Sequence, residues 1–218
     1  MSHTLSEHES KELLRTGGVD VPRDRLVEDA DAAVRAAAEL GHPVAVKLCG
    51  RKIAHKTERG LVRLSLANAD AVREAASALL AARRPDDGDA RLLVSRMVSG
   101  RRELIAGLVR DPQFGPCVML GLGGIFAEAL GDVAFAAAPL ARGDAEDLID
   151  ALQYKKLLGP FRGEPAVDRH ALAAVLETLG RIGAERPDVR SIDVNPLIVS
   201  GDRPVVIDAL VELDGDAP

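Results

Sequence analysis

Residues 103–135 read ELIAGLVRDPQFGPCVMLGLGGIFAEALGDVAF, and this stretch carries the clearest signs of fold in the chain. It contains two apolar runs, Glu103 to Arg110 and Phe114 to Leu120, on either side of Asp111-Pro112-Gln113. Asp and Pro are typical turn residues, and aliphatic runs on both sides of a turn predict a β-hairpin. A further strand is expected over Val133 to Ala138. The stretch therefore predicts antiparallel β-structure.

A glycine run, Gly121-Leu122-Gly123-Gly124, follows the second strand of this hairpin. Glycine allows backbone N–H groups to approach a phosphate closely, and such groups bind anions through their dipoles. The run does not fit the dinucleotide fingerprint, because Phe126 stands where a small residue is needed, and the chain has no Walker motif. Taken alone, it fits a tight turn as well as a phosphate loop.

Outward from this stretch, alanine-rich helices alternate with short apolar strands. We expect helices over 6–15, 29–40, 70–82, about 144–153 and 168–182, and strands over 19–27, 44–48, 61–66, 91–98, 191–199 and 204–211. Ser99-Gly100 is the expected boundary between the lobes. The pattern predicts an α+β protein of two lobes, residues 1–98 and 99–218, with a cleft between them.

Composition excludes several classes of function. The chain has 218 residues, 2% aromatic residues, no Trp and a net charge of −6, which argues against base stacking and against nucleic acid as a partner. No leader-like segment and no run of 18 apolar residues is present, so we expect a cytoplasmic protein with no membrane partner. Cys49 and Cys117 lie in apolar runs and are expected to be free, buried thiols.

Lys47 stands in the predicted strand VAVKL, on the same face as Ala45 and Cys49. A lysine among small apolar neighbours requires an anion, which makes Lys47 a candidate ligand of phosphate. A lysine on an edge strand, where it discourages aggregation, is the alternative.

The segment GRKIAHKTERG, residues 50–60, is strongly basic. It contains Arg51, Lys52, His55, Lys56 and Arg59 against one acid, Glu58. A neutral imidazole is a nucleophile, so His55 is a candidate phosphoryl carrier that flanking cations would assist. A solvated surface loop is the alternative.

The C-terminal segment SIDVNPLIVSGDRPVVIDALVEL, residues 191–213, predicts a hairpin with Gly201-Asp202 in a type II′ turn. In that hairpin, residues whose numbers sum to 403 face each other, so Asn195 lies opposite Asp208. Asp193 shares the face of Asn195, and three such oxygen ligands suit Mg²⁺ held jointly with nucleotide phosphates. Pro196 can break this register, and polar capping of strand ends is the alternative.

In this order, the motifs resemble those of a known family. The run 103–135 closely resembles the ATP-grasp half of the ADP-forming acyl-CoA synthetases, relatives of the succinyl-CoA synthetase β subunit. The likeness extends from LSEHESKELL through KIAHKTERG to IDVNPLIV, five separated motifs in matching order and spacing. It implies a two-lobed ATP-grasp fold with ATP or ADP in the cleft and Mg²⁺ as cofactor.

The resemblance also implies roles for individual residues. His55 is similar to a histidine that relays phosphate between a partner's phosphohistidine and ADP. For the nucleotide, it implies Lys47 at the phosphates, Met97 and Val98 at the adenine hinge, Glu103 lining the site, and Gly121, Gly123, Gly124 and Glu128 in the phosphate loop. For Mg²⁺, it implies Asn195 and Asp208 as ligands with Asp193 beside them. Arg162, in the sequence FRG, falls in a further family motif.

The implied reaction is acyl-CoA + ADP + phosphate ⇌ carboxylic acid + CoA + ATP, the reaction of an acid–CoA ligase. Because 218 residues leave no room for a CoA-binding half, the chain is expected to act with a CoA-binding alpha subunit. Two positions depart from the family pattern, Leu61 in place of a glycine and Ala136 in place of an arginine. They leave open a non-catalytic nucleotide-sensing module that regulates an acyltransferase. Another ATP-grasp carboxylate ligase would normally need an additional N-terminal domain.

Overall fold

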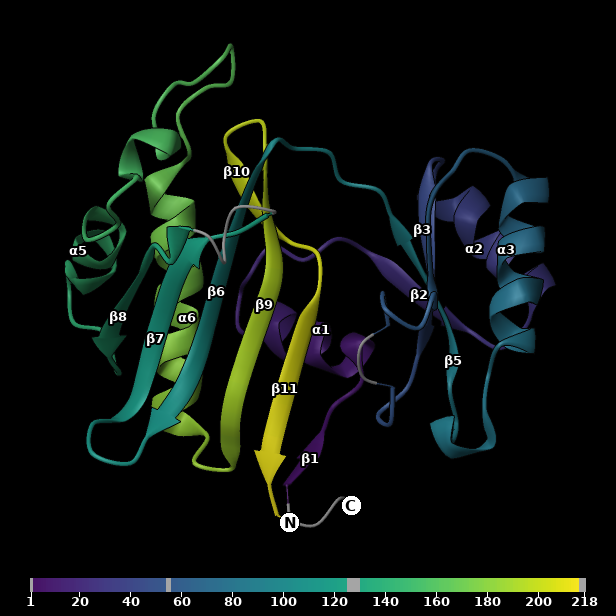
Figure 1. Cartoon of the computed structure of the whole chain (residues 1–218), viewed down its shortest axis with the longest axis horizontal. Helices are drawn as coiled ribbons and strands as arrows, with labels where there is room; N and C mark the ends of the chain where they lie inside the picture. Colours follow the sequence, from purple (N-terminus) through teal and green to yellow (C-terminus); the bar gives the residue numbers. More distant parts are fainter. Residues whose placement is uncertain (1, 54–55, 125–129, 216–218) are drawn as a thin grey trace. The chain divides into compact units, whose positions relative to one another are not determined.

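The computed structural model describes residues 2–53, 56–124 and 130–215. The described elements follow in the order β1 (Ser2–Thr4), α1 (Glu7–Thr16), β2 (Asp24–Val27), α2 (Ala30–Leu40), β3 (Val44–Cys49), β4 (Val62–Leu66), α3 (Ala69–Ala81), β5 (Arg91–Arg96), β6 (Arg102–Asp111), β7 (Gly115–Leu122), β8 (Val133–Ala137), α5 (Asp144–Asp150), α6 (Arg169–Glu185), β9 (Val189–Ser200), β10 (Arg203–Val206) and β11 (Ala209–Asp214) (Figure 1). Short 3₁₀ helices cover Pro85–Asp87 and Lys155–Leu158.

The chain divides into two compact units. The small unit comprises Thr4–Glu9 and Pro22–Met97, and the large unit comprises the chain before Thr4, Ser10–Val21 and everything from Val98 onward. The division after Met97 lies one residue from the boundary expected after Val98. Most of α1 belongs with the large unit, because Ser10 and Leu14 are buried and the Ser10 hydroxyl accepts a hydrogen bond from the Val211 N–H.

The small unit contains a four-stranded antiparallel sheet in the order β2-β5-β3-β4. Helices α2 and α3 begin at Asp29 and Asn68, whose side chains accept the Ala32 and Ala71 N–H groups, as N-cap residues do. Their alanines pack closely against one face of the sheet, where Val46, Leu48 and others form the core. Residues 45, 47 and 49 of β3 therefore point to the opposite face.

The large unit contains a seven-stranded sheet in the order β1-β11-β9-β6-β7-β8, with β10 paired to β9. Helix α6 covers one face of it at very close range. A Cβ added at Gly183 of α6 would lie 2.6 Å from Leu108 of β6, so only glycine permits this approach. Val118 of β7 likewise lies beside Gly180 of α6. We call the face opposite α6 the open face of the large sheet (Figure 1).

Both predicted hairpins are present, and the C-terminal one has the predicted register. In the β6–β7 hairpin, Arg110 pairs with Pro116, and the Asp111 side chain accepts the N–H groups of Gln113 and Phe114. In the C-terminal hairpin, Arg203 pairs with Ser200 and Leu210 with Asp193, so paired numbers sum to 403 as predicted.

Two predicted strands differ from the structure. The single strand expected over 204–211 is divided into β10 and β11, because Pro196 lacks an N–H and the ladder is interrupted opposite it. The strand expected over 19–27 is confined to β2. Its first part instead runs beside β10, where the Asp20 carbonyl accepts the Val206 N–H. No helix among the described residues has the length and apolar character needed to span a bilayer.

Candidate functional site

The candidate metal ligands lie on β9 and beside the start of β11. The Asn195 N–H donates to the Asp208 carbonyl at 3.2 Å, so these residues lie opposite each other as predicted. Asp193 and Asn195 are exposed, whereas their neighbours Ile192 and Val194 are buried toward α6. Alternation along the strand therefore places Asp193 and Asn195 on the open face.

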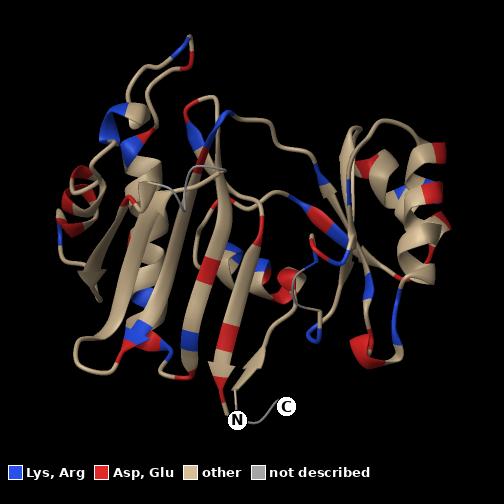
Figure 2. Cartoon of the chain, viewed as in Figure 1, with Lys and Arg blue, Asp and Glu red and all other residues tan. Residues whose placement is uncertain are grey.

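The electrostatics of this cluster favour a cation. Although Asp193 is exposed at the surface of the sheet, desolvation by the surrounding protein raises its pKa above the ordinary value, and the negative charge of Asp208 raises the pKa further. Two carboxyls and an amide supply hard oxygen donors, the type that Mg²⁺ prefers. Figure 2 shows an acidic segment on β9, the strand that carries Asp193. The donor set thus fits a bound Mg²⁺.

The glycine run leaves β7 directly against Glu103. The Gly123 N–H donates to the Glu103 carbonyl at 2.8 Å, and a Cβ at Gly123 would lie 3.0 Å from the Glu103 carbonyl carbon. Gly124 has φ +76 and lies beside the Glu103 carboxylate. Gly121 pairs with Ile105 on the same sheet. The structure therefore brings Glu103 and the glycine run together, whereas Glu128 lies outside the described residues.

Lys47 is buried on the central part of the small sheet and has an acidic partner. Because β3 lies between β5 and β4, the edge-strand alternative for Lys47 is wrong. Its Nζ forms an ion pair at 2.6 Å with Oε1 of Glu7, the first residue of α1, and Lys56 pairs with Oε2 of the same carboxylate. Sequence analysis missed Glu7; its only indication was that a buried lysine requires an anion.

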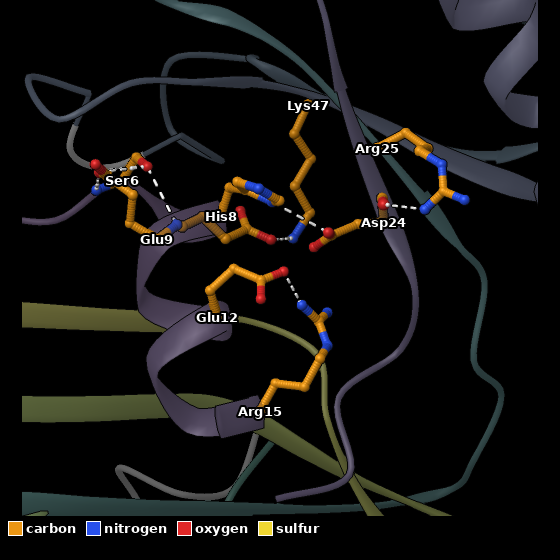
Figure 3. A network of polar contacts seen from close by, with 9 residues as sticks. Ser6, His8, Glu9, Glu12, Arg15, Asp24, Arg25 and Lys47 are labelled. Carbon is orange, nitrogen blue, oxygen red and sulfur yellow. Dashed lines mark hydrogen bonds and ion pairs between the residues drawn. The ribbon is translucent and has the colours of Figure 1, made fainter. Parts of the chain in front are cut away.

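The first turn of α1 is held by a network of polar contacts (Figure 3). Ser6 and Glu9 form a capping box in which the Glu9 carboxylate accepts the Ser6 N–H and hydroxyl. His8 Nδ1 lies 3.1 Å from Oδ1 of the buried Asp24. Arg51 binds Glu9 at 2.6 Å and holds the pKa of Glu9 down at about 2.

The basic segment 50–60 is neutralised by acids rather than solvated. Arg51 pairs with Glu9, Lys56 with Glu7, and Arg59 makes two hydrogen bonds to Asp87 at 2.7 and 2.9 Å. The alternative of a solvated loop is therefore wrong for Lys56 and Arg59, which are half-buried, whereas Arg51 is exposed. His55 lies outside the described residues.

The two departures from the family pattern lie in packed surroundings. Leu61 is 1% exposed and belongs to the core of the small unit. Ala136 pairs with the buried Val118, so it lies on the α6 side of the large sheet rather than on the open face. Phe135, its neighbour on the open face, pairs with Met119.

Several further expectations have mixed outcomes. The Met97 N–H donates to the Pro43 carbonyl at 3.1 Å, and the division between the two units falls between Met97 and Val98. Their expected place beside adenine stays a prediction. Cys49 is a free buried thiol whose pKa is raised by burial, but Cys117 is only half-buried. Arg162 is exposed, has φ 47 and lies over the Phe161 ring at 5.4 Å.

Two antiparallel sheets, each with helices against one face, define an α+β protein of the ATP-grasp class. The chain belongs to the ATP-grasp family, because a family model described as an ATP-grasp domain matches residues 1–213. It is 38% identical over 208 residues to the beta subunit of acetate–CoA ligase (ADP-forming) I from Pyrococcus furiosus, covering 94% of this chain and 90% of that protein.

Solved structures agree with this assignment. Acetyl-coenzyme A synthetase 1 of Ca. Korarchaeum cryptofilum, in complex with coenzyme A and Ca-AMPCP, matches with a TM-score of 0.90 and 37% identity, covering 97% of this chain and 93% of that one. A second structure of that protein contains coenzyme A and Mg-AMPPCP, with a phosphohistidine segment pointing towards the nucleotide binding site. Its TM-score is 0.84 at 38% identity, with the same coverage.

The Arg51–Glu9 pair predicts a pH effect. Because the folded-state pKa of Glu9 is depressed to about 2, the stability it contributes is present above its unfolded pKa and is lost as the pH falls through 2. Arg51→Met is expected to return the pKa of Glu9 toward about 4.3, the ordinary value for glutamate. Carboxyl-carbon NMR titration measures this directly. Arg63→Met is the matched control, and an unchanged Glu9 pKa in Arg51→Met would refute the assignment.

Proposed function

We propose that this chain is the nucleotide-binding β subunit of an ADP-forming acyl-CoA synthetase, an acid–CoA ligase that acts with a CoA-binding alpha subunit. The observation that carries the proposal is the open face, where oxygen donors on β9 and beside β11 lie on the same sheet as the glycine run at Glu103. Similarity to β subunits over nearly the whole length supports it. The name "subunit beta" of that relative supports a partner subunit.

The residues that the structure describes would each bind a different part of Mg·ADP or Mg·ATP. Asp208 and Asn195, with Asp193 beside them, would hold Mg²⁺, which neutralises phosphate charge when bound. The glycine run would lie against the phosphates, and Glu103, whose carbonyl accepts the Gly123 N–H, would line the site. Lys47 would supply a cation to the phosphates, and Met97 and Val98 would support the adenine. Gly121, Gly123 and Gly124 carry no side chain, which would let the phosphates approach the backbone of the run closely.

In the proposed reaction, a phosphoryl group passes from an acyl phosphate through two histidines to ADP. Phosphate displaces CoA from acyl-CoA on the partner and forms an acyl phosphate. The partner's histidine accepts the phosphoryl group and releases the carboxylic acid. His55 accepts it next, and a terminal oxygen of ADP attacks the phosphorus to form ATP and restore the imidazole. The segment of the Korarchaeum protein that points towards its nucleotide binding site supports such a relay.

A catalytic subunit is preferred to a nucleotide-sensing module. The sensing alternative depends on Leu61 and Ala136, but Leu61 packs in the core of the small unit and Ala136 lies on the α6 side of the large sheet. Neither residue removes a donor from the candidate metal ligands.

The phosphoryl-carrier role is tested by intact-protein mass spectrometry after incubation with Mg·ATP at neutral pH. We expect an acid-labile adduct of about 80 Da, because a phosphorylated imidazole hydrolyses in acid. His55→Ala removes the adduct. His42→Ala is the matched control and keeps it. An adduct of equal yield in His55→Ala would contradict the role of His55.

Binding of the metal–nucleotide complex is tested with Asp208→Asn. Loss of one anionic ligand is expected to weaken Mg·ADP binding at least tenfold, measured by titration calorimetry, and to leave metal-free ADP binding within about threefold. Asp202→Asn, at the exposed tip of the same hairpin, is the control and keeps the affinity of the unmodified chain. Equal affinities for Mg·ADP in all three proteins would rule out Asp208 as a ligand.

A further inference from the structure

Glu7 places a carboxylate in the interior of the small unit. Its side chain is 1% exposed, and it is the first residue of α1, where the helix dipole favours a negative charge. One oxygen, Oε1, lies 2.6 Å from Nζ of Lys47, and the other, Oε2, pairs with Nζ of Lys56. A single carboxylate thus joins two lysines.

These two lysines come from different segments. Lys47 belongs to β3 and its side chain is 7% exposed, whereas Lys56 follows His55 in the basic segment and is 17% exposed. The backbone at Lys56 is also fixed, because its carbonyl accepts the Leu61 N–H at 2.8 Å and the Leu61 carbonyl accepts the Leu48 N–H at 3.0 Å. Glu7 therefore ties the first turn of α1, strand β3 and the basic segment together.

The energetics of burying charges indicate that this cluster fixes the positions of its side chains rather than stabilising the fold. Burying charged groups carries a desolvation penalty that their attraction barely offsets, so apolar replacements of similar size are often as stable. Stability of the fold alone therefore does not require charged residues at these positions.

We infer that Glu7 is a positioning residue for phosphoryl transfer, which holds Lys47 and the segment bearing Lys56 in one fixed arrangement. The inference rests on the proposed function for the roles of Lys47 and His55. It assigns to Glu7 no contact with the nucleotide, since its two oxygens are directed at the two lysines.

The first test measures backbone hydrogen exchange in the full chain without nucleotide. Glu7→Gln is expected to speed exchange of the Leu61 and Gly60 amides at least tenfold, because Lys56 loses its anchor. Glu9→Gln is the matched control: it lies in the same turn and pairs with Arg51 of the same segment, but that pair is exposed and glutamine preserves the capping box. Glu9→Gln is expected to change the exchange rates of the Leu61 and Gly60 amides less than twofold. Unchanged exchange in Glu7→Gln would overturn the inference.

The second test separates transfer from binding. In Glu7→Gln, the rate at which Mg·ATP phosphorylates the chain is expected to fall at least 30-fold, while the Kd for Mg·ADP changes less than threefold. Lys56→Met reproduces the slow transfer, and the double variant is no slower than either single one. Glu7→Asp, which retains the charge, is expected to be phosphorylated at least tenfold faster than Glu7→Gln.

The other outcomes are also decisive. Additive losses in the double variant, or a parallel loss of Mg·ADP affinity, would show a general structural role and overturn the inference. Tighter nucleotide binding with unchanged transfer would show that Glu7 competes with phosphate, which also overturns it. If the unmodified chain takes up no phosphate, the carrier role of His55 fails instead, and the exchange measurement still decides whether Glu7 holds the segment.

Discussion

The antiparallel ladder along β9 is the interaction on which the candidate site depends. This strand pairs with β6 on one side and with β10 and β11 on the other. Pro196 cannot donate a ladder hydrogen bond, and the irregularity appears against β6, where Leu104 pairs with Leu197 but Ala106 pairs with Val194. Against β10 and β11, paired residue numbers sum to 403 from Ser200 to Ser191, and the register shifts only at Leu213. Asp193, Asn195 and Asp208 therefore meet because no register shift separates them on this side of the strand.

In the small unit, ion pairs hold the candidate residues in place, as the ladder along β9 does in the large unit. The sheet face opposite α2 and α3 carries Lys47, and the first turn of α1 supplies Glu7 to it. Around this pair, Arg51, Lys56 and Arg59 each bind a separate carboxylate from elsewhere in the unit. A segment rich in cations is in this way held against the protein. Surface pairs such as Arg51–Glu9 add little to stability, so the buried pairs at Glu7 account for most of the constraint.

Local patterns predicted most of the fold and part of the site. Turn residues determined the hairpin registers, including the pairing that places Asn195 opposite Asp208. Pro196 was expected to be able to break the register, and its effect is instead an interruption between β10 and β11 that leaves the pairing unchanged. Glu7 was not predicted as a residue of the candidate site, because its ion-pair partners Lys47 and Lys56 lie 40 and 49 residues away in the chain. Contacts between distant segments have no local signature, whereas turns and alternation do.

In the proposed function, the open face of the large sheet binds a metal–nucleotide complex. The decisive experiment is a crystal structure of the chain with Mg²⁺ and a non-hydrolysable ATP analogue. We expect a metal ion with oxygen ligands from Asp208 and Asn195, and analogue phosphates against the backbone of Gly123 and Gly124. Nucleotide bound elsewhere, or bound with no metal at Asp208 and Asn195, would contradict it.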